Sequence, residues 1–176
     1  MLKKNLLDYL QNAENNNHKL VFGQAEMDYM KQNEISVPQS AQTTADGRWM
    51  DAYLERCHKE TEEMLAEETA EFLKQPISYF DAHKEEFLYM ESPSLQIIAV
   101  DAVTVEMEDI FLTYEAILGL KLQKKHEKAI KDYLSSHLKG DCARYNLLFS
   151  QNDGLWDLNF PLDAVEGFNE QMTIEE

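Results

Sequence analysis

The sequence predicts an α+β fold that is predominantly helical and carries a small antiparallel sheet with a C-terminal hairpin. Three observations lead to this class. Residues 47–74 place apolar side chains mostly three or four positions apart, which is the spacing of one helix face. Residues 120–138 show the same spacing, and Gly140 follows where a helix commonly ends. Residues 145–162 alternate apolar and polar side chains on both sides of Asp153-Gly154, a pattern typical of a β-hairpin.

Shorter patterns predict the remaining elements. We expect helices at 2–13, 24–32, 79–90 and 109–119, and strands at 19–22, 95–100 and 103–108. Pro76 should end the long helix, because proline cannot continue one, and Ser78 is suited to cap the next. The first of the two later strands is a continuous apolar run, whereas the second alternates as a strand with one wet face does.

These elements divide the chain into three parts. Residues 1–33 form an N-terminal helical arm, residues 34–46 a linker rich in turn formers, and residues 47–176 a single α+β domain. A chain of 176 residues has the size of an ordinary domain. Its 44% of apolar residues is sufficient for a packed core, so we expect a folded body with loose ends.

The charge of the chain is strongly unbalanced. There are 33 acidic residues against 16 Lys and Arg, which gives a formal net charge of −17. Such a surface repels phosphate backbones and anionic lipid head groups, so we expect neither direct nucleic-acid binding nor membrane binding. A basic protein is the partner that this charge favours. The competing interpretations are that the charge serves solubility, or pairs internally with the lysines of 120–138.

Cysteine usage and the N-terminus predict a cytoplasmic protein. Cys57 and Cys142 match no metal or redox spacing, and we expect both to be reduced thiols. The chain begins as a signal peptide does, but Asp8 interrupts the apolar core that such a peptide needs. No stretch approaches the roughly 18 unbroken apolar residues of a membrane span.

One motif on the expected helix 47–74 could ligate a metal. Glu55 and His58 are three positions apart and Glu62 is one turn further, so on a helix their side chains would share a face. Helical bundles use carboxylate and imidazole groups at this spacing as metal ligands. The competing interpretation is a solvated helix face, because a chain so rich in Glu produces such spacings by chance. We expect no other cofactor.

The polar side of the same expected helix is the candidate contact surface for a partner. We assign this contact to four of its carboxylates: Glu60, Glu63, Glu67 and Glu71. A complete catalytic set is missing from the sequence. The six glycines form no phosphate-binding loop, and no G-x-S-x-G nucleophile motif is present.

Three segments carry a resemblance to known proteins: 55–63 (ERCHKETEE), 118–125 (LGLKLQKK) and 152–159 (NDGLWDLN). They resemble short proteins of Gram-positive bacteria with no established activity, some of which are labelled after branched-chain aminotransferases. The resemblance covers residues 46–176 and assigns no functional residue here. An aminotransferase needs a lysine for pyridoxal phosphate and a phosphate cup, and no phosphate-binding glycine loop flanks the lysines of this chain.

These observations predict an acidic module that binds a protein partner and acts as an inhibitor, an immunity factor or a regulator, rather than as an enzyme. The first alternative is a small metal-dependent enzyme that uses Glu55, His58 and Glu62. The second is a structural or self-assembly role, in which a homo-oligomer forms through the basic helix or the edge of the C-terminal hairpin.

Overall fold

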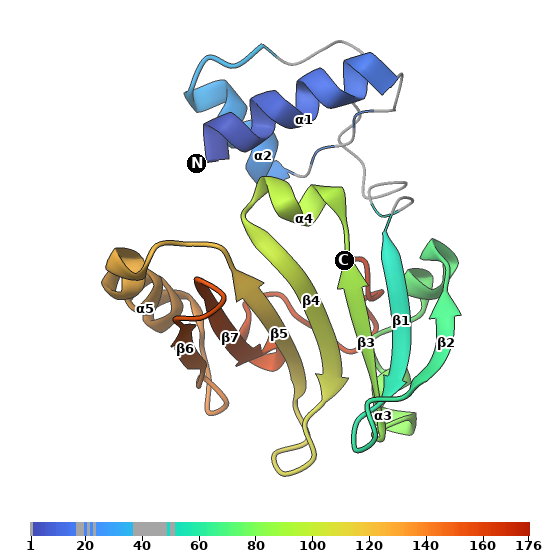
Figure 1. Cartoon of the computed structure of the whole chain (residues 1–176). Coiled ribbons are helices and arrows are strands. Elements are labelled where there is room, and N and C mark those ends of the chain that lie inside the picture. The colour runs from blue at the N-terminus through green and yellow to red at the C-terminus, as the bar shows by residue number, and fades with distance from the viewer. Residues whose placement is uncertain (1, 17–19, 21, 23, 37–48, 50–51) are drawn as a thin grey trace.

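The described residues form a seven-stranded sheet in which every neighbouring pair of strands is antiparallel (Figure 1). The computed structural model describes residues 2–16, 20, 22, 24–36, 49 and 52–176. The strands lie in the order β2-β1-β3-β4-β5-β7-β6. Their bounds are β1 Tyr53–His58, β2 Met64–Glu68, β3 Glu86–Glu91, β4 Val100–Met107, β5 Tyr114–Leu120, β6 Asn146–Ser150 and β7 Leu155–Pro161.

Short helices pack around this sheet. One group lies at the end of the sheet where β4 begins (top of Figure 1): α1 Leu2–Asn16, α2 Gln24–Gln32 and α4 Pro93–Ile97. A second group packs on one face of the sheet together with the C-terminal segment: the 3-10 helices η1 Ala70–Lys74 and η3 Leu162–Ala164, and the α-helices α3 Tyr79–Ala82 and α5 Glu127–His137.

The expected predominantly helical fold is wrong, and the largest error is the helix at 47–74. The residues described there form the hairpin β1–β2 and then η1. The helix-like spacing came partly from Leu54 and Cys57, which lie on opposite faces of β1 because side chains alternate along a strand. The sequence of β2, MLAEE, consists of good helix formers. Its pairing with β1 outweighs that local preference, which differs by less than about 1 kcal/mol per residue.

Three shorter expectations are also wrong. Residues 79–90 hold α3 and most of β3, and residues 109–119 hold a loop and most of β5. In place of the strand expected at 95–100, α4 runs to Ile97, a turn follows, and β4 begins only at Val100. Ser92 begins α4, because its Oγ accepts a hydrogen bond from the backbone nitrogen of Ser94 at 3.1 Å. Pro93 follows at the start of the helix. Serine followed by proline is a helix-start signal. Here it outweighs the strand preference of the apolar run at 95–100.

Elements with strong local signals are confirmed. α1 contains the expected helix 2–13, α2 coincides with 24–32, β4 contains most of 103–108, and β6 and β7 form the expected hairpin. The helix expected at 120–138 is shortened to η2 Lys124–His126 and α5. Residues 19 and 21 of an expected strand and 37–46 of the expected linker lie outside the described residues.

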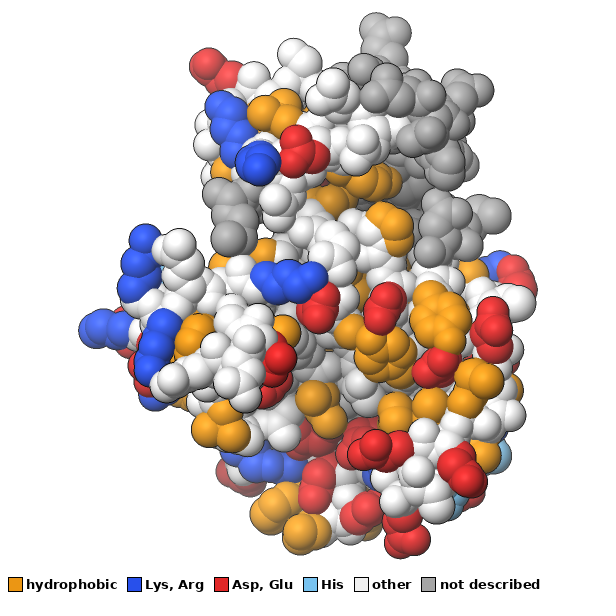
Figure 2. Space-filling model, in the orientation of Figure 1, with side chains coloured by type: hydrophobic (Ala, Val, Ile, Leu, Met, Phe, Trp, Pro, Cys, Tyr) orange, Lys and Arg blue, Asp and Glu red, His pale blue; other side chains and the backbone are white. Residues whose placement is uncertain are grey.

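The sheet has a covered face and an open face. The register places Leu88 opposite Val105 and Val105 opposite Ala116, so these side chains share the covered face. The open face is turned toward the viewer in Figure 1, and no described helix crosses it. Figure 2 shows the same face in space-filling form.

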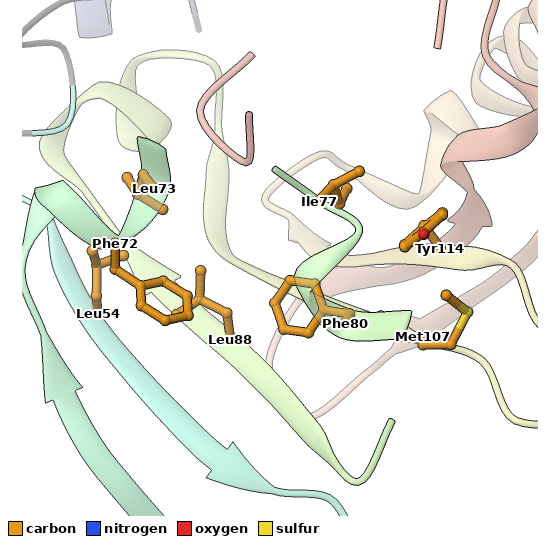
Figure 3. Packing of buried hydrophobic residues seen from close by; sticks show 8 residues of the cluster. All are labelled: Leu54, Phe72, Leu73, Ile77, Phe80, Leu88, Met107 and Tyr114. Carbon is orange, nitrogen blue, oxygen red and sulfur yellow. The ribbon is translucent and has the colours of Figure 1, made fainter. Parts of the chain in front are cut away.

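Buried apolar side chains join η1 and α3 to the covered face (Figure 3). The cluster consists of Leu54, Phe72, Leu73, Ile77, Phe80, Leu88, Met107 and Tyr114. Leu88 lies between the rings of Phe72 and Phe80 and is 1% exposed. A separate cluster joins α5 to β7 through Leu134, Leu138 and Leu158. The two clusters thus cover the same face of the sheet at two places, one over β1 and β3 and the other over β7.

The N-terminal helices dock on the end of the sheet through α4. Leu6 and Leu10 of α1 and Met30 of α2 are buried in one cluster with Ile97 of α4. The side-chain amide of Asn5 also donates to the carbonyl oxygen of Gln96 at 3.2 Å. The described part of the expected N-terminal arm therefore contacts the body of the protein.

Leu88→Ala should lower the free energy of unfolding by about 2–5 kcal/mol, because truncating a fully buried leucine leaves a cavity. Denaturant unfolding measures the change. The matched control is Leu148→Ala in β6, whose side chain is 60% exposed. It should change the free energy by less than about 0.5 kcal/mol. Equal effects of the two changes would contradict this assignment of the covered face.

Candidate functional site on the open face of the sheet

The open face carries carboxylates and aromatic rings on adjacent strands. We call seven of these residues the acidic face: Tyr53, Glu55, Glu67, Phe87, Tyr89, Glu91 and Glu106. The register places Glu55 beside Glu67 and Tyr89. It also places Tyr53 beside Glu91 and Phe87 beside Glu106. Figure 2 shows the result, with acidic and apolar side chains interleaved over β1, β3 and β4.

The two tyrosines are hydrogen-bonded to carboxylates of the same face. Tyr53 donates its phenol to Glu55, and Tyr89 donates to Glu91 at 2.5 Å. The bond to Glu55 and partial burial raise the pKa of Tyr53 to about 12. Burial and the bond to Glu91 raise the pKa of Tyr89 as well. Both phenols therefore stay protonated at neutral pH and hold ring and carboxylate in a fixed relation.

The arginine of β1 is directed away from the acidic face. Arg56 lies on the covered side, where its Nη1 donates to both carboxylate oxygens of Glu86 at 3.0 Å. Its Nε donates to Glu68 at 2.9 Å, and Tyr79 donates to Glu86 at 2.9 Å. Burial alone would raise the pKa of Glu86, but the bonds from Arg56 and Tyr79 outweigh burial and lower it. Arg56 thus neutralises carboxylates of the covered side and leaves Glu55 and its neighbours on the open side.

A pocket of about 250 Å³ continues the acidic face toward β5. Its charged lining consists of Glu106, Glu108, Glu115 and Arg144. Arg144 donates to Glu115 at 2.7 Å. Burial raises the pKa of both Glu106 and Glu115, although Lys59 opposes the shift at Glu106 and Arg144 opposes it at Glu115. A further cation brought into this pocket would offset the cost of burying these carboxylates.

An apolar loop tip lies beside this pocket, between β4 and β5. Ile110 is 80% exposed, and Phe111 and Leu112 are also exposed. The loop is held in shape by Glu108, whose Oε2 accepts hydrogen bonds from the backbone nitrogens of Ile110 and Phe111 at 3.0 and 2.6 Å. The guanidinium of Arg144 stacks over the Phe111 ring, 4.3 Å from its centroid. We call residues 110–112 the apolar tip.

The structure does not bring the predicted metal ligands together. Glu55 lies on the open face, while His58, three positions along the same strand, points to the other side. The Nδ1 of His58 accepts a hydrogen bond from the backbone nitrogen of Glu60 at 3.2 Å. Glu62 lies in the turn before β2, with a φ of 56°. The metal site stays a prediction. It depended on helical spacing, and the three residues do not lie on a helix.

Another group of ligand-type side chains does converge within the described part of the chain. Atoms of His83, Glu85 and Glu86 lie within 4.8 Å of one another. Both oxygens of Glu86 already accept hydrogen bonds from Arg56, and one also accepts from Tyr79. Because these donors already satisfy the one buried carboxylate of the group, the cluster is explained without an ion.

The four predicted partner contacts are scattered. Glu60 and Glu63 are exposed in the turn between β1 and β2, and Glu67 belongs to the acidic face. Glu71 lies in η1, where it pairs with Lys74 at 2.7 Å.

Most of the acidic face was not predicted from the sequence. The prediction missed above all the aromatic residues and the carboxylates of β3 and β4. The alternation of Phe87, Tyr89 and Glu91 along one strand was the signal that could have revealed them.

The lysines of the 120–138 region are largely paired within the chain. Lys128 contacts Asp132 at 2.5 Å, and Lys131 contacts Glu127 at 2.6 Å. Lys121 forms an ion pair with Asp101. On the acidic face, Lys59 contacts Glu106 at 3.8 Å, and the four carboxylates of that face outnumber this cation.

Comparisons with family models, curated proteins and solved structures find no match to the chain. The resemblance to Gram-positive proteins therefore stays a prediction. None of the helices in the described residues is long and apolar enough to span a membrane.

Arg56→Met should lower the free energy of unfolding by roughly 2–4 kcal/mol at pH 7, because it leaves the charge of Glu86 buried without its main partner. The folded-state pKa of Glu86 is lowered, so the stability from its carboxylate exists above the unfolded pKa and is lost as the pH falls. The deficit of the variant should therefore shrink between pH 7 and pH 4, as measured by denaturant unfolding.

Adding Glu86→Gln to Arg56→Met provides the control. The double variant no longer buries a charge, so it should recover part of the lost stability at pH 7 and show a weaker pH dependence. An Arg56→Met protein within about 0.5 kcal/mol of the parent would indicate that Arg56 is a surface residue, and would contradict the ion pair.

Proposed function

We propose that the protein binds a basic segment of a protein partner through the acidic face, and so acts as an inhibitor, an immunity factor or a regulator. One observation carries the proposal. Carboxylates of four adjacent strands gather on the open face, whereas Arg56 is turned to the covered side. Part of the negative charge of the chain thus lies on a surface that a partner can reach.

The chemistry of the acidic face favours lysine and arginine side chains. Carboxylates can accept their N–H groups, and the faces of Tyr53, Phe87 and Tyr89 can attract the same cations. Tyrosine is also enriched at protein interfaces, where one ring supplies large contact area at little entropic cost. A polyanion would be repelled by the same surface, which supports a protein partner rather than a nucleic acid.

The apolar tip supplies a second kind of contact. Binding energy in protein interfaces is concentrated in a few apolar or aromatic anchors, while surrounding charges act mainly on association rate and specificity. Ile110 protrudes beside the acidic pocket with 80% of its surface exposed. We therefore assign the anchor to the tip and the steering of the partner to the acidic face.

We also propose that the protein acts in the cytoplasm. Cys57 is buried and Cys142 is partly exposed, and both are free thiols. Free cysteines are typical of reducing compartments, where disulfides do not persist.

The combined change Glu55→Gln, Glu67→Gln and Glu91→Gln should abolish capture of a basic partner from a lysate of the source cells at low salt. Glutamine keeps the size and the acceptor oxygen but removes three charges. Binding by the parent protein should itself disappear in 1 M salt, where the Debye length is about 3 Å. Pulldown followed by protein identification measures both effects.

The matched control for that variant is Glu85→Gln, Asp132→Asn and Asp141→Asn, which removes three exposed charges outside the acidic face. It should retain the partner. Equal loss in both variants would show that only net charge matters. Failure to capture any basic protein at low salt would contradict the proposed function.

Ile110→Ser should weaken binding of the captured partner by about tenfold and leave the free energy of unfolding within about 0.5 kcal/mol of the parent. Calorimetric titration with the purified partner measures the first quantity, and denaturant unfolding measures the second. The control Leu148→Ser removes an equally apolar exposed side chain from β6 and should bind normally. Unchanged affinity of Ile110→Ser would exclude the tip as an anchor.

A further inference from the structure

The covered face holds a cavity of about 470 Å³. Its roof is the middle of the sheet, formed by Leu88 and Met90 of β3, Val103 and Val105 of β4, and Ala116 of β5. Protein interiors normally leave few voids larger than one water molecule, whereas ligand cavities run from about 300 to 1,000 Å³. The volume therefore belongs to the range of a binding site rather than to that of a packing defect.

The position of the cavity follows from how the covered face is packed. Both clusters lie on the covered face. The cluster around Leu88 packs over β1 and β3, and the cluster around Leu134 and Leu158 packs over β7. Between them, Val103 and Val105 of the central strand are only half-buried. A central strand is ordinarily the most buried part of a sheet, so this gap between the clusters is unusual.

The floor of the cavity is the C-terminal segment 165–176, which runs beneath the sheet like a strap. Its apolar side chains Phe168, Met172 and Ile174 line the cavity. One end of the segment is tied to Leu138, the residue that follows α5, by the bridge between Val165 and Leu138.

The other end of the strap is tied to the chain before α3. Ile77 donates its backbone N–H to the carbonyl of Met172 at 2.8 Å, and Ile174 donates to that of Gln75 at 3.0 Å. Gly167, with a φ of 89°, turns the chain between the two attachments. The strap is thus anchored at both ends and spans the cavity between them.

The charge around the cavity determines which head group an amphiphilic ligand can carry. The described lining residues include Glu166, Glu175 and Glu176 but no Lys, Arg or His. The carboxylate of Glu176 is fixed by Thr173, whose backbone nitrogen and hydroxyl both donate to it at 2.9 Å. A fatty-acid carboxylate would be repelled here, whereas an ammonium group would find acceptors.

We propose that this cavity binds a cationic amphiphile, a small molecule whose apolar chain lies beneath β3–β5 and whose amine lies among Glu166, Glu175 and Glu176. The site is separate from the acidic face, because it lies on the opposite side of the sheet. Its existence does not depend on the proposed protein partner.

Calorimetric titration with three single-chain probes below their micelle concentrations tests the proposal: decyltrimethylammonium, 1-decanol and decanoate. The parent protein should bind one molecule of the ammonium probe, bind the alcohol less tightly and bind decanoate weakest. Val105→Phe fills the cavity and should weaken the ammonium probe at least about tenfold. If Val105→Phe fails to fold, Val103→Phe replaces it. This change also fills the cavity, from the neighbouring position of β4 on the covered face.

Two controls separate the cavity from general attraction to an acidic protein. Leu148→Phe, which adds a ring on the exposed edge strand, and the triple glutamine variant of the acidic face should both bind the ammonium probe as the parent does. Replacing Glu166, Glu175 and Glu176 together by Gln should bring the affinities for ammonium and alcohol close to each other. No binding, binding that both cavity-filling variants leave unchanged, or tighter binding of decanoate would each overturn the proposal.

Discussion

The ion pair between Arg56 and Glu86, in which Nη1 donates to both carboxylate oxygens, is the interaction on which the charge distribution around β1 depends. It holds a guanidinium and a carboxylate on the covered side of neighbouring strands, with Glu68 and Tyr79 as further partners. A strand that turns Arg56 to one side must turn Glu55 and Cys57 to the other. Satisfying the buried charge of Glu86 therefore fixes the carboxylate of β1, Glu55, on the open side.

The two faces of one sheet consequently offer two different kinds of surface. The open face interleaves carboxylates with tyrosine and phenylalanine rings, and ends at the apolar tip. The covered face holds the Arg56–Glu86 ion pair at one end of β1 and β3, and it keeps an apolar cavity beneath its central strand. The open face suits a large basic surface, and the cavity suits a small amphiphile. The same alternation of side chains along β1 to β5 produces both surfaces.

Sequence patterns predicted the elements whose signals are local and left out those that depend on distant partners. The C-terminal hairpin was predicted because its alternation and its Asp153-Gly154 turn lie within one short segment. β1 was mistaken for helix because Leu54 and Cys57 happen to match helical spacing, and its partner β3 begins 28 residues after β1 ends. The surplus of acid was evident from composition. The surface that displays it was not, because that surface exists only once β1, β2, β3 and β4 are paired in register.

A titration followed by two-dimensional NMR tests most directly whether the open face is where cations bind. The probe is a short Lys-Gly repeat peptide added at low salt to isotopically labelled protein. We expect the amide shifts to concentrate at Glu55, Tyr89 and Glu106 and to vanish when salt is raised. Shifts spread evenly over the acidic residues of the chain, or centred on α5 or the C-terminal segment, would contradict the charge distribution that Arg56 imposes.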